Sequence, residues 1–196
     1  ALVIGSMILY FEIQRDKKLE NPQLSDLAVE PDLFMSTADR NFQDNKASKA
    51  IDFLENAIKT MKLLERDGDS ISTSAIEVAI RDLEVVENHI KAEDINEDLM
   101  YEAFADAMNS LAFASLRVSE QFIKEGKMEE ARVTINHSMD HLQNSIRFAR
   151  GQQKEDEIRI AGHLQRIIED HLEDNISEID VVMAEIDSVV QAHVIQ

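Results

Sequence analysis

The sequence predicts an all-α protein, an antiparallel helical bundle or a short array of helical repeats, with an apolar helix at its N-terminus. Three observations lead to this fold class. Glycine and proline, on which most turns depend, number only 5 and 2 among 196 residues. Apolar residues recur at steps of three and four along most of the chain, which is the spacing of one helix face. Hydrophobic residues make up 44% of the chain and aromatic residues only 5%, so we expect an aliphatic core.

Residues 1–18 are expected to form an apolar anchor helix. The first eleven residues carry no charged side chain. The side chains expected to contact a membrane or a partner are Leu2, Val3, Ile4, Met7, Ile8, Leu9, Tyr10 and Phe11. Eleven helical residues rise about 16 Å, roughly half the thickness of the hydrocarbon core of a bilayer. We therefore interpret the segment as part of a membrane anchor. The apolar stretch of a signal peptide and a helix buried against protein are the alternatives.

The end of the anchor bears on the location of the protein, and the segment after the anchor bears on the domain boundaries. We expect a membrane-associated protein with an extracytoplasmic body. A cytoplasmic body is the alternative, because the basic residues Arg15, Lys17 and Lys18 favour the inner side of a membrane. Residues 19–31 hold both prolines of the chain and are expected to be a linker to a helical domain over residues 32–196.

The first three helices of the domain are predicted from apolar stripes and the residues that flank them. A short helix is expected over about residues 32–44. Its predicted apolar face comprises Leu33, Phe34, Thr37, Ala38 and Phe42. A second helix follows over residues 47–64 and ends at the Asp-Gly-Asp sequence of residues 67–69. The hydroxyl side chains of residues 72–74 can cap a third helix, whose stripe runs over residues 76–90.

Two longer helices are predicted in the middle of the chain. The first covers about residues 95–125, where Asp94 and Glu97 have the spacing of a capping box. Gly126 is placed to end this helix in the left-handed conformation. The next helix is expected over residues 127–150.

The C-terminal part carries a long apolar seam. From Ile158 to Val190 apolar residues alternate steps of three and four for more than four heptads, which is typical of a helix-packing surface. The sequence leaves open whether this stretch is one helix or breaks into two at Asp174 and Asn175. A homo-oligomer assembled through residues 158–190 is one use of this seam.

Two segments resemble the helical hairpins of tetratricopeptide repeats. Residues 122–131 read Phe-Ile-Lys-Glu-Gly-Lys-Met-Glu-Glu-Ala, with an aromatic residue closing one helix, glycine in the turn and alanine opening the next helix. The same spacing is met in the first hairpin by Phe34, Ala38, Ala50, Leu54 and Ala57. The resemblance covers about residues 33–66 and 115–150, and serines replace the family's aromatic residue and glycine at positions 115 and 119. It implies a helical repeat that binds proteins.

Catalytic motifs are missing from the sequence. It has no glycine-rich phosphate loop, no Gly-x-Ser-x-Gly elbow and no His-Glu-x-x-His motif. No glutamate lies three residues before any of the six histidines, as the di-iron helical bundles require. We therefore expect no catalytic residues, no enzymatic activity and no cofactor.

Histidines supply the alternative function, a metal- or cofactor-binding helical bundle. His137 and His141 are four residues apart, so they share one face of the fifth helix and are weak candidates for metal ligands. His163 and His171 could add a further ligand. Because solvent-facing histidines are ordinary in an acidic helix, we expect no metal at this pair.

Charge narrows the choice of partners. There are 39 acidic and 20 basic residues, a formal net charge of −19, which repels nucleic-acid phosphates. The leading prediction is a non-catalytic, membrane-tethered helical scaffold or interaction subunit of a larger protein assembly. Its partners would be other proteins, including subunits of membrane complexes, with basic surfaces favoured.

Overall fold

The structure is a computed structural model that describes residues 28–65, 70–94, 96–169 and 175–192. Over these ranges it holds helices and no strand, which confirms the all-α fold class. The predicted anchor helix of residues 1–18 lies outside the described residues, as does most of the predicted linker. No helix in the described ranges is both long and apolar enough to cross a bilayer.

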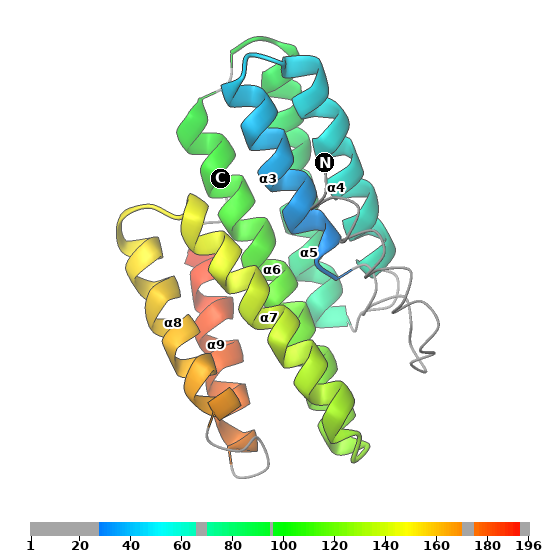
Figure 1. The fold of residues 1–196 in the computed structure, drawn as a ribbon, viewed down its shortest axis with the longest axis vertical. Coiled ribbons are helices and arrows are strands. Elements are labelled where there is room, and N and C mark those ends of the chain that lie inside the picture. The colour runs from blue at the N-terminus through cyan, green and yellow to red at the C-terminus, as the bar shows by residue number, and fades with distance from the viewer. Residues whose placement is uncertain (1–27, 66–69, 95, 170–174, 193–196) are drawn as a thin grey trace, which may run out of the picture.

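The helices follow one another along the chain with short connections. They are α3 (Glu30–Gln43), α4 (Ala47–Glu65), α5 (Ser70–Lys91), α6 (Glu97–Lys124), α7 (Met128–Phe148), α8 (Gly151–Glu169) and α9 (Ile176–Ala192). Each helix packs against the next one along the chain. In addition, α6 packs against α9, so α6, α7, α8 and α9 form a four-helix bundle. Figure 1 shows α3, α4 and α5 beside one half of α6, and α8 and α9 at the opposite end of the molecule.

The long helix α6 is the centre of the molecule. Every residue from 103 to 114 is buried, so this stretch has no solvent-facing side. The stripe pattern had predicted one buried face along this helix, whereas the structure surrounds it. Five of these twelve residues are alanines, and their small side chains let neighbouring helices approach from all directions.

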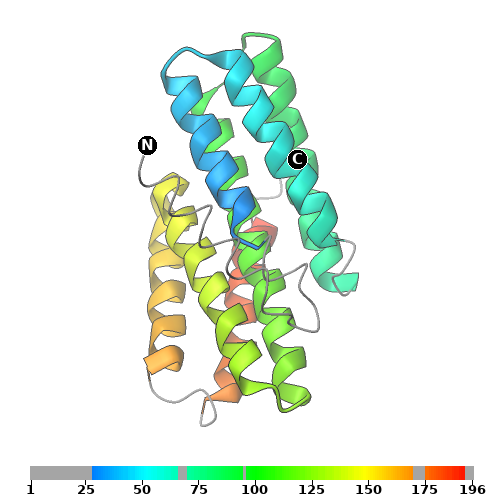
Figure 2. The same ribbon diagram turned by 45° about the vertical axis from the view of Figure 1, so that its right-hand side comes forward.

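Two hydrophobic cores lie on either side of the middle of α6. The first is formed by α3, α4, α5, the first half of α6 and the C-terminal end of α7, with Leu54, Met61 and Leu83 among its buried side chains. The second is formed by the second half of α6 with α7, α8 and α9, and includes Leu142 and Leu164. Both cores are mainly aliphatic, as expected from the composition. Turning the view by 45° shows α6 passing from one group of helices to the other (Figure 2).

The start of α3 differs from the prediction. The helix begins at Glu30, and Pro31 lies in its first turn, where the missing N–H is not needed for a helical hydrogen bond. Leu33, predicted to be buried, is 45% exposed, whereas Asp32 and Met35 are buried. Ala38 is buried and Phe34 and Phe42 pack against the first core, as predicted, so Leu33 is the exception. Asp32 has polar partners in the interior, which are described below.

The ends of α6 show one wrong prediction and one correct prediction. The capping box of Asp94 and Glu97 does not form. Asn96 caps the helix, because its Oδ1 accepts a hydrogen bond of 2.9 Å from the backbone N–H of Asp98, while Asp94 bonds to His89. At the other end Gly126 has φ +73°, which confirms the left-handed stop.

The predicted C-terminal seam is divided between α8 and α9, which pack against each other. Ile160, Leu164, Ile179, Val182 and Ile186 are buried in the second core. These side chains are therefore buried within a single chain. Oligomerisation through residues 158–190 stays a prediction.

The two segments with repeat resemblance form helical hairpins. Residues 33–65 lie in α3 and α4, and residues 115–150 cover the second half of α6 and α7. Kinship with tetratricopeptide repeats stays a prediction, since antiparallel hairpins occur in many helical folds.

Candidate functional site

The structure places the two candidate histidines near the middle of α7. His141 is 1% exposed, and His137, one turn earlier, is half-buried. Both line a groove between α5, α6 and α7. The sequence prediction that they share one side of a helix is therefore confirmed.

His141 is bonded to Asp32 across the interior. Its Nδ1 lies 2.9 Å from each carboxylate oxygen of Asp32, which is 2% exposed. Asn144 Nδ2 donates a third hydrogen bond, 3.0 Å long, to Asp32 Oδ2. Asp32 also lies in the first turn of α3, where the helix dipole favours a negative charge. The cluster ties the start of α3 to α7 and uses one ring nitrogen of His141.

Sequence reasoning missed Asp32, which it assigned to the first residue of a short helix with no partner. An aspartate in a first helical turn is common for reasons of the helix dipole alone. Nothing in the local pattern indicates a bond to a residue 109 positions away.

His137 has no charge at neutral pH. Burial, together with the neighbouring His141, lowers the pKa of its imidazole to about 4. It therefore presents a neutral polar ring to the groove.

The histidines in the described part of the chain do not assemble a metal centre of three or more protein ligands. No group of three or more His, Cys, Asp or Glu residues in the described part of the chain is arranged to hold a metal ion. His163 lies on α8 and faces α9, where its ring nitrogens lie 3.1 Å from Glu178 Oε2 and 3.3 Å from Glu185 Oε2. His171 is outside the described residues. Metal binding at His137 and His141 thus gains no third ligand from described residues.

A second buried polar cluster joins α6, α7 and α8. Glu157, which is fully buried, accepts hydrogen bonds of 2.7 Å from Asn109 Nδ2 and from Ser145 Oγ. Gln153 Nε2 donates a bond of 2.9 Å to Asp106 Oδ1. These contacts pair Asn109 Nδ2 and Asp106 Oδ1 on the central helix, while Asn109 Oδ1 is buried without a hydrogen-bond partner.

The charge state of Asp106 is set by its surroundings. Burial, with the carboxylates of Glu102, Glu157 and Asp82 acting in the same direction and the bond from Gln153 opposing them, raises its pKa to about 8. The side chain is therefore largely protonated at neutral pH.

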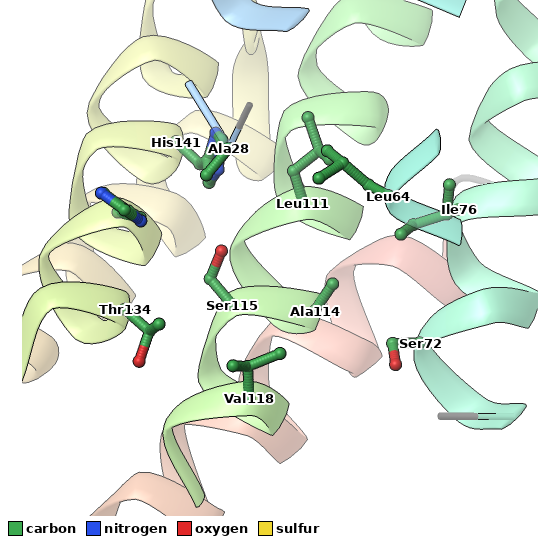
Figure 3. A pocket seen from close by; sticks show the side chains of 11 residues that line it. Ala28, Leu64, Ser72, Ile76, Leu111, Ala114, Ser115, Val118, Thr134 and His141 are labelled. Atoms are coloured by element: carbon green, nitrogen blue, oxygen red, sulfur yellow. The ribbon is translucent and has the colours of Figure 1, made fainter. Parts of the chain in front are cut away.

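The groove between α5, α6 and α7, hereafter the α6 groove, is apolar and narrow. Its lining residues are Ala28, Leu64, Ser72, Ile76, Leu111, Ala114, Ser115, Val118, Thr134, His137 and His141. None of them is Lys, Arg, Asp or Glu, although such residues make up 30% of the chain. In Figure 3, Leu111, Ser115 and Val118 follow one another along α6, with Thr134 and His141 on one wall and Ile76 and Ser72 on the other.

A second and larger groove lies between α8 and α9, hereafter the α8–α9 groove. Its volume is about 410 Å³. The side chains along it are Asp156, Arg159, Val181, Ala184, Glu185, Ser188 and Val189. Val181 is 49% exposed, and Ala184 and Ser188 continue the exposed stripe one and two turns further along α9.

The α8–α9 groove is negatively charged. Helix α9 carries Glu178, Asp180, Glu185 and Asp187 and has no Lys or Arg. The one basic lining residue, Arg159, forms ion pairs with Asp156 and Glu185. This groove therefore combines exposed apolar side chains with an acidic rim.

The Asp32–His141 bond is expected to matter for stability. Asp32→Ala should lower the free energy of unfolding by about 3 kcal/mol, because it leaves a buried polar ring without its partner. Asn144→Ala, which removes one bond to the same carboxylate, should cost about 1 kcal/mol. Urea unfolding of Asp32→Ala, His141→Leu and the double variant measures the coupling energy. Additive effects of the two single substitutions would show that the pair does not interact.

Asp106 is expected to make stability depend on pH. Its pKa is higher in the folded state than in the unfolded chain, so the folded state binds the proton more tightly and stability falls as pH rises from about 4 to 8. Asp106→Asn should be about as stable as the wild type at pH 4 and more stable by roughly 2 to 4 kcal/mol at pH 9. Urea unfolding at both pH values measures this difference, with the exposed Asp52→Asn as control. An Asp106→Asn variant without this pH-dependent gain would contradict the expectation.

Comparison with known proteins adds no relative to this picture. No protein family, curated protein or solved structure shows significant similarity to the chain.

Proposed function

We propose that this protein is a non-catalytic, all-helical interaction subunit of a larger assembly. Residues 1–18 tether it to a membrane, and its body receives a helical segment of a partner protein in the α8–α9 groove. The partner segment is amphipathic and basic, with an apolar face for the groove and Lys or Arg for its rim.

The observation that carries this proposal is the composition of the α8–α9 groove. Exposed Val181, Ala184 and Ser188 lie at helical spacing on α9, and such a stripe suits the apolar face of an added helix. An exposed valine beside small residues lets another helix approach closely. Carboxylates of α9 would meet basic residues beside that contact, and Asp180 is the most direct candidate, because Glu178 and Glu185 already contact His163 and Arg159.

Electrostatics favours the same class of partner. The net charge of −19 attracts basic segments over distances of about a Debye length, and the pairing of Arg159 leaves little positive charge in the groove. Complementary charge mainly raises the association rate and selects partners, while the apolar contact slows dissociation of the complex.

Membrane attachment is supported by the sequence of residues 1–18. Their uncharged apolar run followed by basic residues suits the bilayer interface, and Tyr10 and Phe11 are residue types enriched there. The hairpin resemblance to tetratricopeptide repeats is consistent with binding of proteins.

A model peptide tests the groove. The probe is an 18-residue helical peptide with leucines on one face and lysines on the other, labelled for fluorescence anisotropy. We expect binding that weakens between 0.05 and 0.5 M salt. Val181→Glu should weaken binding about fivefold or more even though it makes the protein more acidic, because it places a charge in the apolar contact.

A matched pair of charge reversals separates the groove from the general acidity. Asp180 on α9 and Asp52 on α4 are both exposed, so Asp180→Lys and Asp52→Lys change the net charge equally. Only Asp180→Lys should weaken peptide binding severalfold. Equal effects of the two substitutions, or unchanged binding of Val181→Glu, would reject the groove as the binding site.

Vesicle flotation tests the tether. The full chain should float with neutral phosphatidylcholine vesicles, and a chain that starts at residue 19 should remain at the bottom of the gradient, because the deleted residues provide the apolar surface. Circular dichroism of the shortened chain checks that the helical body is unchanged. Flotation of neither chain, or of both, would refute a tether within residues 1–18.

A further inference from the structure

We propose that His137 and His141 together bind one divalent transition-metal ion in the α6 groove, and that Cu²⁺ is the ion they hold most tightly. Water completes the coordination, because no third His, Cys, Asp or Glu in the described part of the chain is placed to join the pair. The expectation of no metal assumed histidines that face solvent, whereas His141 is buried and His137 is half-buried in the groove. This site is independent of the function proposed above.

The spacing of the two histidines suits a shared ion. They lie four residues apart on α7, and both line the same groove. Side chains at this spacing have Cβ atoms about 5 to 6 Å apart, so two imidazoles can reach one ion at metal–nitrogen distances of about 2.0 to 2.1 Å. The rings are close enough for His141 to lower the pKa of His137. One helix therefore supplies two nitrogen ligands.

Asp32 holds His141 in the manner of a metal-bound histidine. An ionised carboxylate only accepts hydrogen bonds, so the Nδ1 that lies 2.9 Å from both Asp32 oxygens carries the ring proton. The lone pair of the neutral ring is then on Nε2, which has no hydrogen bond to a described residue. Metal-bound histidines almost always donate their other ring N–H to a carboxylate or a carbonyl, which fixes the ring and raises its basicity. The Asp32–His141 pair has this arrangement.

His137 is ready to bind an ion at neutral pH. Metal ligands must be deprotonated, and the pKa of about 4 means that this ring has already lost its proton. No hydrogen bond to a described residue restrains it either. The ring is therefore available to turn toward an ion bound by His141.

The groove has the size and the chemistry of a small-ion site. Its enclosed space is about 20 Å³, enough for roughly one water molecule or one ion. No Lys or Arg lines it, so no fixed positive charge repels a cation. The hydroxyl of Ser115 points into the groove in Figure 3, where it can bond to metal-bound water. Imidazole ligands suit copper, nickel and zinc, and among these divalent ions Cu²⁺ binds nitrogen ligands most tightly.

Copper titration followed by NMR tests the site. The paramagnetic Cu²⁺ ion broadens the signals of nearby nuclei, and the probe is Cu²⁺ added in less than equimolar amount to the full chain without an affinity tag. The backbone amides of residues 134–141 should broaden before those of α4, which contains no histidine. His137→Ala removes no hydrogen bond to a described residue and should lower the affinity of this site for Cu²⁺ about tenfold or more.

Two further variants separate this site from adventitious copper binding. His163→Ala also removes one histidine, but on α8, and it should leave the broadening of residues 134–141 unchanged. Asp32→Asn keeps both ligands and should lower the affinity about 10- to 100-fold, because it removes the acceptor that orients His141. Circular dichroism of each variant checks its fold.

Electron paramagnetic resonance counts the ligands. The wild type should show coupling of the copper to two imidazole nitrogens, and His137→Ala should show coupling to one. Equal affinities of the wild type and His137→Ala would overturn the proposal. Broadening that begins elsewhere in the chain, or no broadening at all, would overturn it as well.

Discussion

The middle of α6 has no face toward water, and the positions of the other helices follow from this constraint. Twelve consecutive buried residues need apolar neighbours on every side, and helices from both halves of the chain supply them. Asp106 and Asn109 lie within this stretch, and a buried polar group without a partner costs about 1 to 3 kcal/mol. Asp106 Oδ1 and Asn109 Nδ2 are paired from within the protein, and Asn109 Oδ1 is left without a partner.

The partners come from α7 and α8 and set how these helices are aligned. Gln153 and Glu157 lie one turn apart on α8, and they reach Asp106 and Asn109 on α6 respectively. A shift of α8 by one turn would break both contacts together. The Asp32–His141 bond aligns α3 with α7 in the same way. Apolar packing alone tolerates many alignments, whereas these directional bonds are met in one.

Sequence patterns predicted the helices well because their signals are local. Apolar spacing located α3 to α7 to within a few residues, and Gly126 ended α6 as expected, whereas α8 begins at Gly151, seven residues before the predicted seam. The start of the same helix was misassigned because Asn96, two residues beyond Asp94, competes for the same role. The exposure of Leu33 was missed because the neighbouring Asp32 is buried through its bond to His141, which hydrophobic spacing does not indicate.

The candidate site was only partly predictable. Spacing brought His137 and His141 to one side of α7, but the partner of His141 is 109 residues away, and no local pattern records such a distance. The same holds for Asp106 and Gln153, which are 47 residues apart. Grooves depend on where helices stop relative to their neighbours, so neither the α6 groove nor the α8–α9 groove could be located from hydrophobic periodicity.

The sharing of α6 by both cores also determines how the chain can come apart. In a protein with two domains joined by a linker, each part can be excised and still fold. Here, cutting the chain in the middle of α6 would remove one wall from each core at once. The two halves are therefore expected to melt in one cooperative step, and neither should survive as an autonomous fragment.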